Sequence, residues 1–180
     1  MKDITKEVKR ILEAIEGEPL RKDLIETPQR VQRAFEEMMS GYAVDVPSLF
    51  KSFEEGLDQI VCVKDIPFYS TCEHHLEKFF GTVHVAYLPK GRAIGASKIP
   101  RIVEAYAHRL QIQERLAEQI AHALMENLDP YGVCVIIEAT HLCVRCRGIK
   151  SSTAVMKNSI MLGVFRQKQA LRMEVLSLLQ

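Results

Sequence analysis

Several features that mark specialised classes of protein are scarce in this sequence of 180 residues. No stretch approaches the roughly 18 uncharged apolar residues that a membrane-spanning helix needs. The first residues, Met-Lys-Asp-Ile-Thr-Lys-Glu, lack the apolar run of a secretory signal, which predicts a protein of the cytoplasm. An excess of charge of either sign is also missing, since 24 Lys and Arg are balanced by 23 Asp and Glu. A nucleic-acid binder usually carries a basic excess, so this balance argues against that class.

The chain also lacks internal repeats, low-complexity tracts and Gly/Ser-rich linkers. Its length suits one domain, and 47% hydrophobic with 26% charged residues is typical of a globular fold. Cysteine is present in an odd number that does not suggest a disulfide framework, at Cys62, Cys72, Cys134, Cys143 and Cys146. In a reducing compartment, cysteines close to histidine indicate metal binding or catalysis instead.

The first 45 or so residues are predicted to be helical. One buried helix face is predicted from the spacing i, i+3, i+4, i+7 of Val8, Ile11, Leu12 and Ile15. A second helix is predicted to begin with Thr27 as the N-cap and Pro28 at the first helical position. Gly41 is placed to end that helix.

From about residue 59 the pattern changes to runs rich in β-branched and aromatic residues, which predict strands. The expected strands lie at 60–63, 81–87 and 133–147, with a last strand or pair reaching residue 165. An apolar stripe predicts a long helix over 97–127 with a candidate break near 109–112, and a closing helix follows residue 166. Without regular βαβ alternation, this order favours an α+β antiparallel fold, with N-terminal helices over 1–45 and a core over 59–180.

The segment Thr71-Cys72-Glu73-His74-His75 is the most unusual one in the sequence. Two residues separate Cys72 from His75, so a tight turn can present both side chains to one metal ion. A partner segment, His141 to Arg147, carries Cys143 and Cys146. Soft and borderline ligands of this kind suit Zn²⁺.

Two ligand sets are open at this point. If 133–147 is extended, Cys143 and Cys146 lie on opposite faces of the strand. Zinc would then bind Cys72, His75 and Cys143, and its fourth position would stay open for water, as in a catalytic site. Alternatively, Cys146 joins the other three ligands and closes a structural site.

Histidines and basic residues near these segments add candidate roles. His74 and His141 lie beside the ligands and are candidate proton carriers. Basic pairs lie near the starts of two predicted helices. Lys98 and Arg101 lie in the first turn after Ser97, and Arg30 and Arg33 lie in the first two turns after Thr27. A cation is unfavourable there, whereas a bound phosphate would use the free N–H groups together with the basic side chains. With Arg147 beside the metal segment, the pattern suggests a polyphosphate.

Ordinary alternatives remain for these charged residues. Arg30 or Arg33 could form salt bridges with Glu16, Glu18 or Glu36. Glu114 could accept two N–H bonds from the edge of a guanine, or it could be a solvated helix residue.

Taken together, these motifs resemble GTP cyclohydrolase I, a zinc enzyme of tetrahydrofolate and pterin biosynthesis. The resemblance runs from about residue 10 to 170. It rests on Glu26-Thr27-Pro28-Gln29-Arg30-Val31, Ser40-Gly41-Tyr42, Cys72-Glu73-His74-His75-Leu76, Ser97-Lys98 with Arg101, Gln111 to Leu116, His141 with Cys143, Arg147-Gly148 and Leu162-Gly163-Val164-Phe165.

The resemblance implies a role for each matching residue. It implies that zinc binds Cys72, His75 and Cys143, and that His74 and His141 are the acid/base histidines. It also implies that Glu114, helped by Gln113, holds the guanine. The triphosphate contacts that it implies are Ser97, Lys98, Arg101, Arg147 and Arg30, with Arg33 as an addition.

The resemblance further implies one family domain over 1–180 with the tunnel fold, an antiparallel sheet packed by helices. The implied reaction hydrates C8 of GTP, releases formate and closes a new ring to give 7,8-dihydroneopterin triphosphate. The implied assembly is a homodecamer of two stacked pentamers with active sites between subunits, where Arg30 could come from a neighbour.

The sequence departs from the family pattern at Ala96, at Glu77-Lys78, at the extra thiol Cys146 and over 156–160, but no proposed ligand or acid/base residue is lost. Two other functions match parts of the pattern. One is a structural-zinc or GTP-binding relative without turnover. The other is a zinc nucleoside deaminase, whose signature fails because no Pro precedes Cys143 and because His75 and Cys143 lie far apart.

Overall fold

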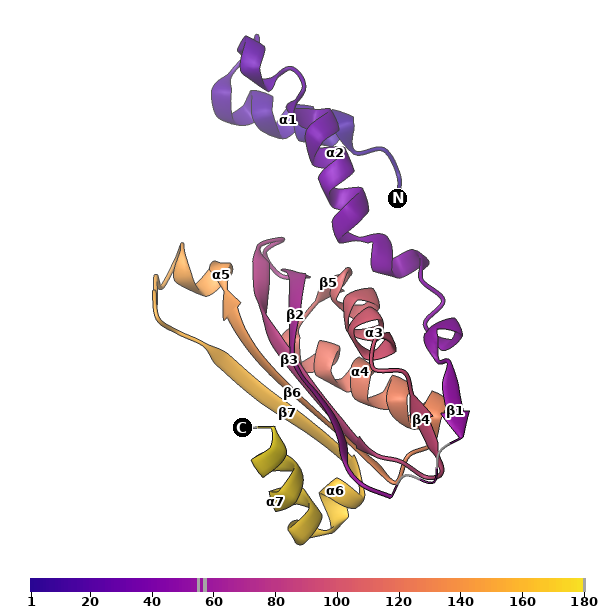
Figure 1. Cartoon of the computed structure of the whole chain (residues 1–180). Helices are drawn as coiled ribbons and strands as arrows, with labels where there is room; N and C mark the ends of the chain where they lie inside the picture. The colour runs from indigo at the N-terminus through magenta and orange to yellow at the C-terminus, as the bar shows by residue number, and fades with distance from the viewer. Residues whose placement is uncertain (55, 57, 180) are drawn as a thin grey trace. The chain divides into compact units, whose positions relative to one another are not determined.

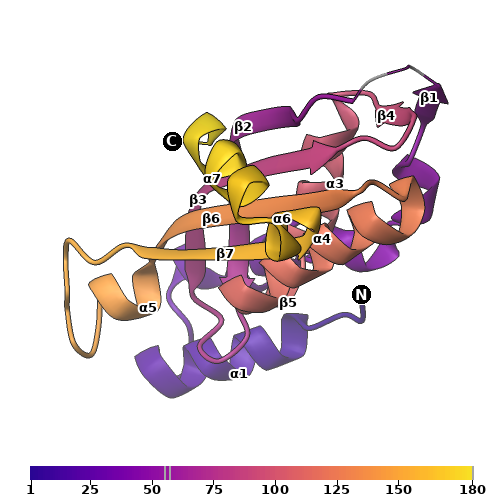
Figure 2. The same cartoon turned by 90° about the horizontal axis from the view of Figure 1, so that it is seen from below.

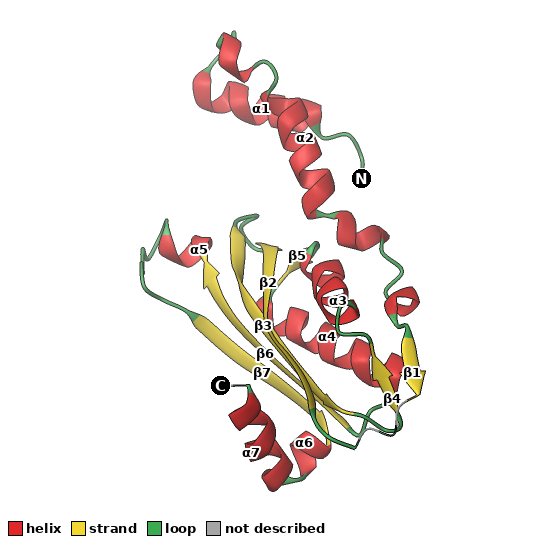
Figure 3. Cartoon of the chain, in the orientation of Figure 1, coloured by secondary structure: helices red, strands yellow, loops and turns green. Residues whose placement is uncertain are grey.

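The computed structural model describes residues 1–54, 56 and 58–179, and the chain forms two compact units, Met1–Ser40 and Gly41–Gln180 (Figure 1). Helices and strands alternate irregularly along the second unit (Figure 3). Among the described residues, no helix is both long and apolar enough to cross a membrane.

The N-terminal unit consists of α1 (Thr5–Glu16), η1 (Lys22–Leu24) and α2 (Thr27–Met38), and α1 packs against α2. Val8 and Leu12 are half-buried, but Ile11 and Ile15 are 59% and 74% exposed. The expectation of one fully buried face on α1 is therefore wrong, because α2 covers only part of the apolar stripe within this unit. The second helix begins one residue earlier than predicted, with Glu26 rather than Thr27 at the cap position.

The second unit is built on a curved sheet whose strand order is β5-β2-β3-β6-β7. Its pairs are antiparallel except for the short parallel pair of β2 with β5, so the predicted α+β antiparallel class is confirmed. The strands of this sheet are β2 (Val61–Cys72), β3 (Lys78–Leu88), β5 (Leu110–Gln111), β6 (Gly132–His141) and β7 (Met156–Gly163). A separate two-stranded sheet pairs β1 (Ser52–Glu54) with β4 (Arg92–Ile94), and the short helices η2 (Ser40–Ala43) and η3 (Pro47–Leu49) precede it.

Helices cover both faces of the main sheet. On one face, α3 (Lys98–Ala107) and α4 (Gln113–Leu128) pack against β2, β3 and β6 around the main hydrophobic core (Figure 1). Leu116, Ile120 and Leu124 are spaced one helical turn apart on α4, and all three are fully buried there. On the other face, α6 (Val164–Gln167) and α7 (Gln169–Leu178) close a smaller core, and α6 lies against β6 and β7 (Figure 2).

The helical region predicted over 97–127 is divided where the sequence suggested a break. Helix α3 ends at Ala107, the two residues of β5 follow, and α4 begins at Gln113. Strand β5 pairs in parallel with the end of β2, through Thr71 with Leu110 and Cys72 with Gln111. The break therefore places the start of α4 beside the segment that carries Cys72.

The strand predicted over 133–147 is shorter than expected. Strand β6 ends at His141, and a helical turn, α5 (Leu142–Arg145), follows it. The pairing with β3 stops at Phe79 and His141, so the backbone beyond this point has no strand partner on β3. A helical turn pairs these groups locally, as the bond from the Cys146 N–H to the Leu142 carbonyl shows.

Gly41 was expected to end the second helix, but α2 stops at Met38 and Gly41 belongs to η2. Its N–H donates to the carbonyl of His108, and a Cβ built on it would overlap the Ala105 carbonyl. The glycine is required by this close approach to the end of α3 rather than by a helix cap.

We expect Gly41→Ala to lower the free energy of unfolding by about 1–3 kcal/mol, because the backbone of α3 must shift to admit the methyl group. Denaturant unfolding followed by circular dichroism measures the change. Gly56→Ala is the matched control, since a Cβ on Gly56 meets nothing within 4 Å. Equal stability of the two variants would contradict this account of Gly41.

Candidate active site

The turn between β2 and β3 presents the first two candidate ligands. The N–H of Leu76 donates to the carbonyl of Cys72, and the N–H of Cys72 donates to the carbonyl of Glu77. Leu76 has a positive φ of 56°, which reverses the chain within a few residues. Across this turn, Cys72 Sγ lies 3.7 Å from His75 Nδ1, so the predicted presentation of both side chains to one point is confirmed.

Cys143, on α5, completes a cluster with these two residues. The ligand atoms of Cys72, His75 and Cys143 all lie within 4.8 Å of one another. Cys72 is buried, Cys143 is half-buried and His75 is exposed, so the cluster has a protein side and an open side.

The donor set fits a divalent metal. Zinc bound at about 2.0–2.3 Å in tetrahedral geometry places its ligand atoms roughly 3.3–3.8 Å apart. The 3.7 Å between Cys72 Sγ and His75 Nδ1 falls in this range, and all three ligand atoms lie within 4.8 Å of one another. Burial raises the pKa of the Cys143 thiol, and the neighbouring Cys72 raises it further. Negative charge on Cys72 therefore opposes ionisation of Cys143, and a cation between the two sulfur atoms would relieve that repulsion.

Cys146 lies outside the cluster, but not for the reason that strand alternation gave. Cys143 and Cys146 are three residues apart around a helical turn, not on opposite faces of a strand. The Cys146 side chain is exposed, and its thiol donates to the carbonyl of Leu142. The exclusion of Cys146 from the metal ligands stays a prediction, whereas the extended geometry from which it was argued is wrong, because the chain is helical there.

His141 ends β6, two residues before Cys143. Its ring stacks on Phe79 with the centroids 4.7 Å apart and the planes only 5° from parallel. Its Nε2 lies 2.8 Å from Oε1 of Gln113. Burial lowers the pKa of His141, and the charge of Glu114 partly opposes that shift.

His74, the other candidate proton carrier, is exposed in the turn. Its Nε2 lies 3.8 Å from a carboxylate oxygen of Glu73. Glu73 also accepts two hydrogen bonds from the guanidinium of Arg115, at 2.5 and 3.0 Å. These bonds are the main cause that holds the pKa of the Glu73 carboxyl below its ordinary value.

The Glu73–Arg115 ion pair was not predicted from the sequence. This pair joins the turn between β2 and β3, which carries Cys72 and His75, to the first turn of α4. The two residues are 42 positions apart, so their contact leaves no local pattern in the sequence. The available signal is an acidic residue inside the Cys-x-x-His segment and a basic residue beside Glu114, which would need a partner. The N–H of Glu73 also donates to the carbonyl of Gln111, so backbone and side chain hold the turn together.

Glu114 and Gln113 open α4, but the structure treats them differently. Glu114 is exposed, so its carboxylate is accessible to a ligand. Gln113 is 1% exposed, and its amide group bonds to protein atoms from β6 and β7. The structure thus leaves Glu114 open to a base and places the Gln113 side chain inside the fold.

The remaining residues of the predicted phosphate site are spread over several elements. Ser97 precedes α3 at its N-cap position, and its hydroxyl forms no capping bond. Lys98 lies in the first turn of α3, and Arg101 is exposed one turn later. Among the described residues, no ion pair occupies Lys98 or Arg101. Arg147 is exposed after α5, close enough to Cys143 for its charge to lower that thiol's pKa slightly.

Arg30 and Arg33 belong to α2 of the N-terminal unit. Arg30 pairs with Glu26 at 2.8 Å, one turn earlier on an exposed surface. This partner is not among the acidic residues expected from the sequence, although a salt bridge at Arg30 was one of the open alternatives.

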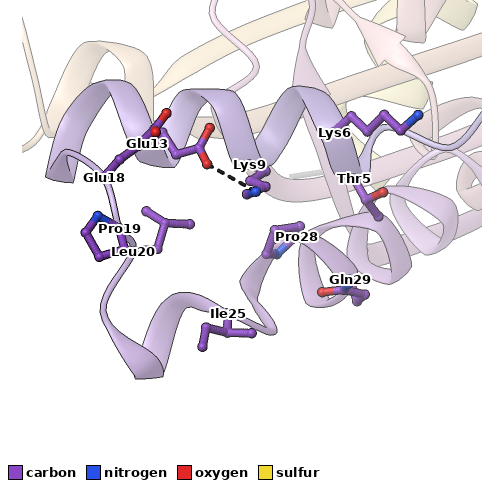
Figure 4. A pocket seen from close by; sticks show the side chains of 10 residues that line it. All are labelled: Thr5, Lys6, Lys9, Glu13, Glu18, Pro19, Leu20, Ile25, Pro28 and Gln29. Carbon is purple, nitrogen blue, oxygen red and sulfur yellow. Dashed lines mark ion pairs between the residues drawn. The ribbon is translucent and has the colours of Figure 1, made fainter.

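The same unit contains a pocket between α1, the following loop and the start of α2 (Figure 4). An ion pair between Lys9 and Glu13, one turn apart on α1, lies along one wall of the pocket at 3.3 Å. None of the predicted metal, base or phosphate residues lines this pocket.

Comparison with known proteins identifies the family of this chain. The family model described as GTP cyclohydrolase I matches residues 4–180. GTP cyclohydrolase 1 of Campylobacter jejuni (strain RM1221) is 50% identical over 174 residues, covering 96% of this chain and 92% of that protein. GTP cyclohydrolase 1 of Thermoanaerobacter pseudethanolicus is 51% identical over 178 residues, covering 98% and 95%.

Among solved structures, the archaeosine synthase QueF-Like in the apo form matches with a TM-score of 0.46 and 20% identity. That match covers 58% of this chain and 93% of the other. The family model and the relatives at about half identity show that the chain is an enzyme that belongs to the GTP cyclohydrolase I family.

We expect Cys143→Ala to lose bound zinc, because it removes one of three converging ligand atoms. Cys146→Ser should retain zinc and is the matched control on the same helical turn. Metal analysis after gel filtration measures zinc per chain. Full zinc content in Cys143→Ala, with loss in Cys146→Ser, would move the third ligand to Cys146.

Arg115→Met should release zinc about tenfold faster to a competing chelator, because the turn then loses its side-chain tie to α4. Stopped-flow transfer of zinc to a chromophoric chelator gives the rate. Arg172→Met, an exposed substitution on α7, serves as the control. An unchanged rate in Arg115→Met would show that the backbone pairing alone holds the turn.

Proposed function

We propose that this protein is a zinc-dependent enzyme that converts GTP to 7,8-dihydroneopterin triphosphate and releases formate, the first step of tetrahydrofolate and pterin biosynthesis. The observation that carries the proposal is the convergence of Cys72, His75 and Cys143 beside His141 in a chain of this family. A cluster with an open side is what a catalytic rather than a structural metal site requires.

In this proposal, Cys72, His75 and Cys143 hold the zinc. When bound, zinc supplies the Lewis acidity that makes water reactive toward the purine at neutral pH. The cluster is anchored on its buried side by the sheet, and its exposed side, at His75, admits water and substrate.

The two histidines take the proton-transfer roles. Burial favours neutral His141 near pH 7, so it can accept a proton and return it. His74 is exposed in the same turn and is the candidate for exchange with solvent. Glu114 presents two carboxylate oxygens, which match two N–H donors on the guanine edge.

The triphosphate is assigned to basic residues and a helix end. Helix α3 has ten residues, and the Ser97 hydroxyl, Lys98 and Arg101 lie at its N-terminal end, where the helix dipole favours an anion. Arg147 adds a cation on the side of the metal cluster. Arg30 and Arg33 are assigned to the same phosphates, from a neighbouring subunit.

The proposal includes a single family domain over 1–180 with the tunnel fold, assembled as a homodecamer. The α+β architecture of the second unit is consistent with a tunnel-fold subunit. A cytoplasmic location belongs to the proposal too, because thiolate ligands persist in a reducing compartment.

We expect zinc-loaded protein to release one formate per GTP consumed and to yield a pterin that fluoresces after oxidation. His141→Ala should lower kcat by about 10²–10⁴-fold while it keeps zinc, because it removes a proton carrier and no ligand. Formate determination, product fluorescence and metal analysis on the same samples give these quantities.

Chelation of the metal should abolish formate release, and added zinc should restore it. Ammonia without formate would favour a nucleoside deaminase. GTP binding without any product would favour a relative that has lost turnover. Either result would contradict the proposed reaction.

A further inference from the structure

Gln113 is the most deeply buried of the predicted site residues, at 1% exposure. Its amide nitrogen, Nε2, lies within hydrogen-bond distance of three oxygens, which are the Ile137 carbonyl at 3.2 Å, the Met156 carbonyl at 3.1 Å and Oδ1 of Asn158 at 2.8 Å. An amide NH₂ group has two N–H donors, and these three acceptors use both.

These neighbours determine which way the amide group faces. If the amide were flipped, its oxygen would face two carbonyl oxygens with no hydrogen between them, which burial makes costly. Oε1 therefore faces the opposite direction, toward Nε2 of His141 at 2.8 Å.

The amide orientation determines where His141 carries its hydrogen. An amide oxygen can only accept a hydrogen bond, so Nε2 of His141 must be the donor. In the neutral ring, Nδ1 is then the nitrogen with the free lone pair. No other hydrogen bond to this ring is formed within residues 1–54, 56 and 58–179.

The ring plane of His141 is also restricted. Phe79 is fully buried and faces His141 across the β3–β6 pairing, and the two rings stack nearly parallel. Stacking on Phe79 limits tilting of the imidazole ring, and the hydrogen bond that Nε2 donates to Gln113 limits flipping of the ring about its Cβ–Cγ bond.

We propose that Gln113, anchored by Asn158, is a positioning residue that holds His141 as the Nε2–H tautomer and leaves Nδ1 as its proton-accepting atom. This inference rests on the proposed function for the catalytic role of His141. It assigns to Gln113 a task other than the guanine contact implied by the family resemblance, because both ends of its amide are already paired inside the fold.

Asn158 accepts a hydrogen bond from the Gln113 amide. It lies on β7 in the segment 156–160, where the sequence departs from the family pattern, and pairs in register with Ile137. Its side chain supplies the shortest of the three bonds to Gln113. Asn158, from the segment that departs from the family pattern, therefore holds the site residue Gln113 in place.

The first test separates positioning from substrate binding. In zinc-loaded full-length protein, Gln113→Met should lower kcat by about a hundredfold or more, leave KM for GTP within about threefold and keep zinc. A large rise in KM with unchanged kcat would overturn the inference, because it would show that Gln113 binds the base. Gln167→Met, an exposed position on α6, is the control for the substitution itself.

A matched pair at Asn158 tests the anchor without touching Gln113. Asn158→Leu removes the acceptor and should lower kcat about tenfold, whereas Asn158→Asp keeps an acceptor oxygen and should restore most of it. Equal activity of these two variants would contradict a role for the acceptor. The pair also decides the matter if Gln113→Met fails to fold.

The tautomer can be observed directly by ¹⁵N NMR of protein labelled at histidine, with His141→Gln used to assign the resonances. Wild-type protein should show a protonated Nε2 and an unprotonated Nδ1, and Gln113→Met should show both tautomers. A protonated Nδ1 in the neutral wild-type ring would overturn the inference. This readout does not depend on turnover, so absence of formate release would contradict the proposed function alone.

Discussion

The short parallel pairing of β2 with β5 is the constraint on which the site depends. It joins Cys72 to Gln111, so the turn that carries two candidate ligands starts beside the short strand that leads into α4. The pairing of Phe79 with His141 then brings the end of β6, and Cys143 after it, to the same end of the sheet. A slip of one residue in either register would turn the side chains to the opposite face and separate the ligands.

Much of this arrangement could be predicted from local signals. The Cys-x-x-His spacing indicated a turn, and the turn between β2 and β3 places Cys72 Sγ 3.7 Å from His75 Nδ1. The change from helical spacing to runs rich in β-branched and aromatic residues indicated the α+β class, and the break expected near 109–112 is where β5 lies. Such features depend on residues within a few positions of each other, which is the range over which sequence patterns carry information.

Features that depend on distant partners could not be predicted. The end of β6 at His141 follows from where β3 begins, and no residue between 142 and 147 signals it. The Glu73–Arg115 pair and the Gln113–Asn158 bond join residues 42 and 45 positions apart. The burial of Gln113 also depends on distant residues, its neighbours on β6 and β7. The sequence could not predict it, because a glutamine beside a glutamate in a helix ordinarily faces solvent.

The helical turn α5 carries the candidate metal ligand Cys143 and separates it from the loop that follows. Arg145 donates to the carbonyls of Thr153 and Ala154, and the Ser151 N–H donates to Val144, so the loop after Cys146 is closed at its base. Lengthening such a loop adds little closure entropy. The tip of this loop, around Gly148 to Lys150, can therefore accept inserted residues while Cys143 stays in place. Evolution can change the loop beside the candidate metal cluster without altering the cluster itself.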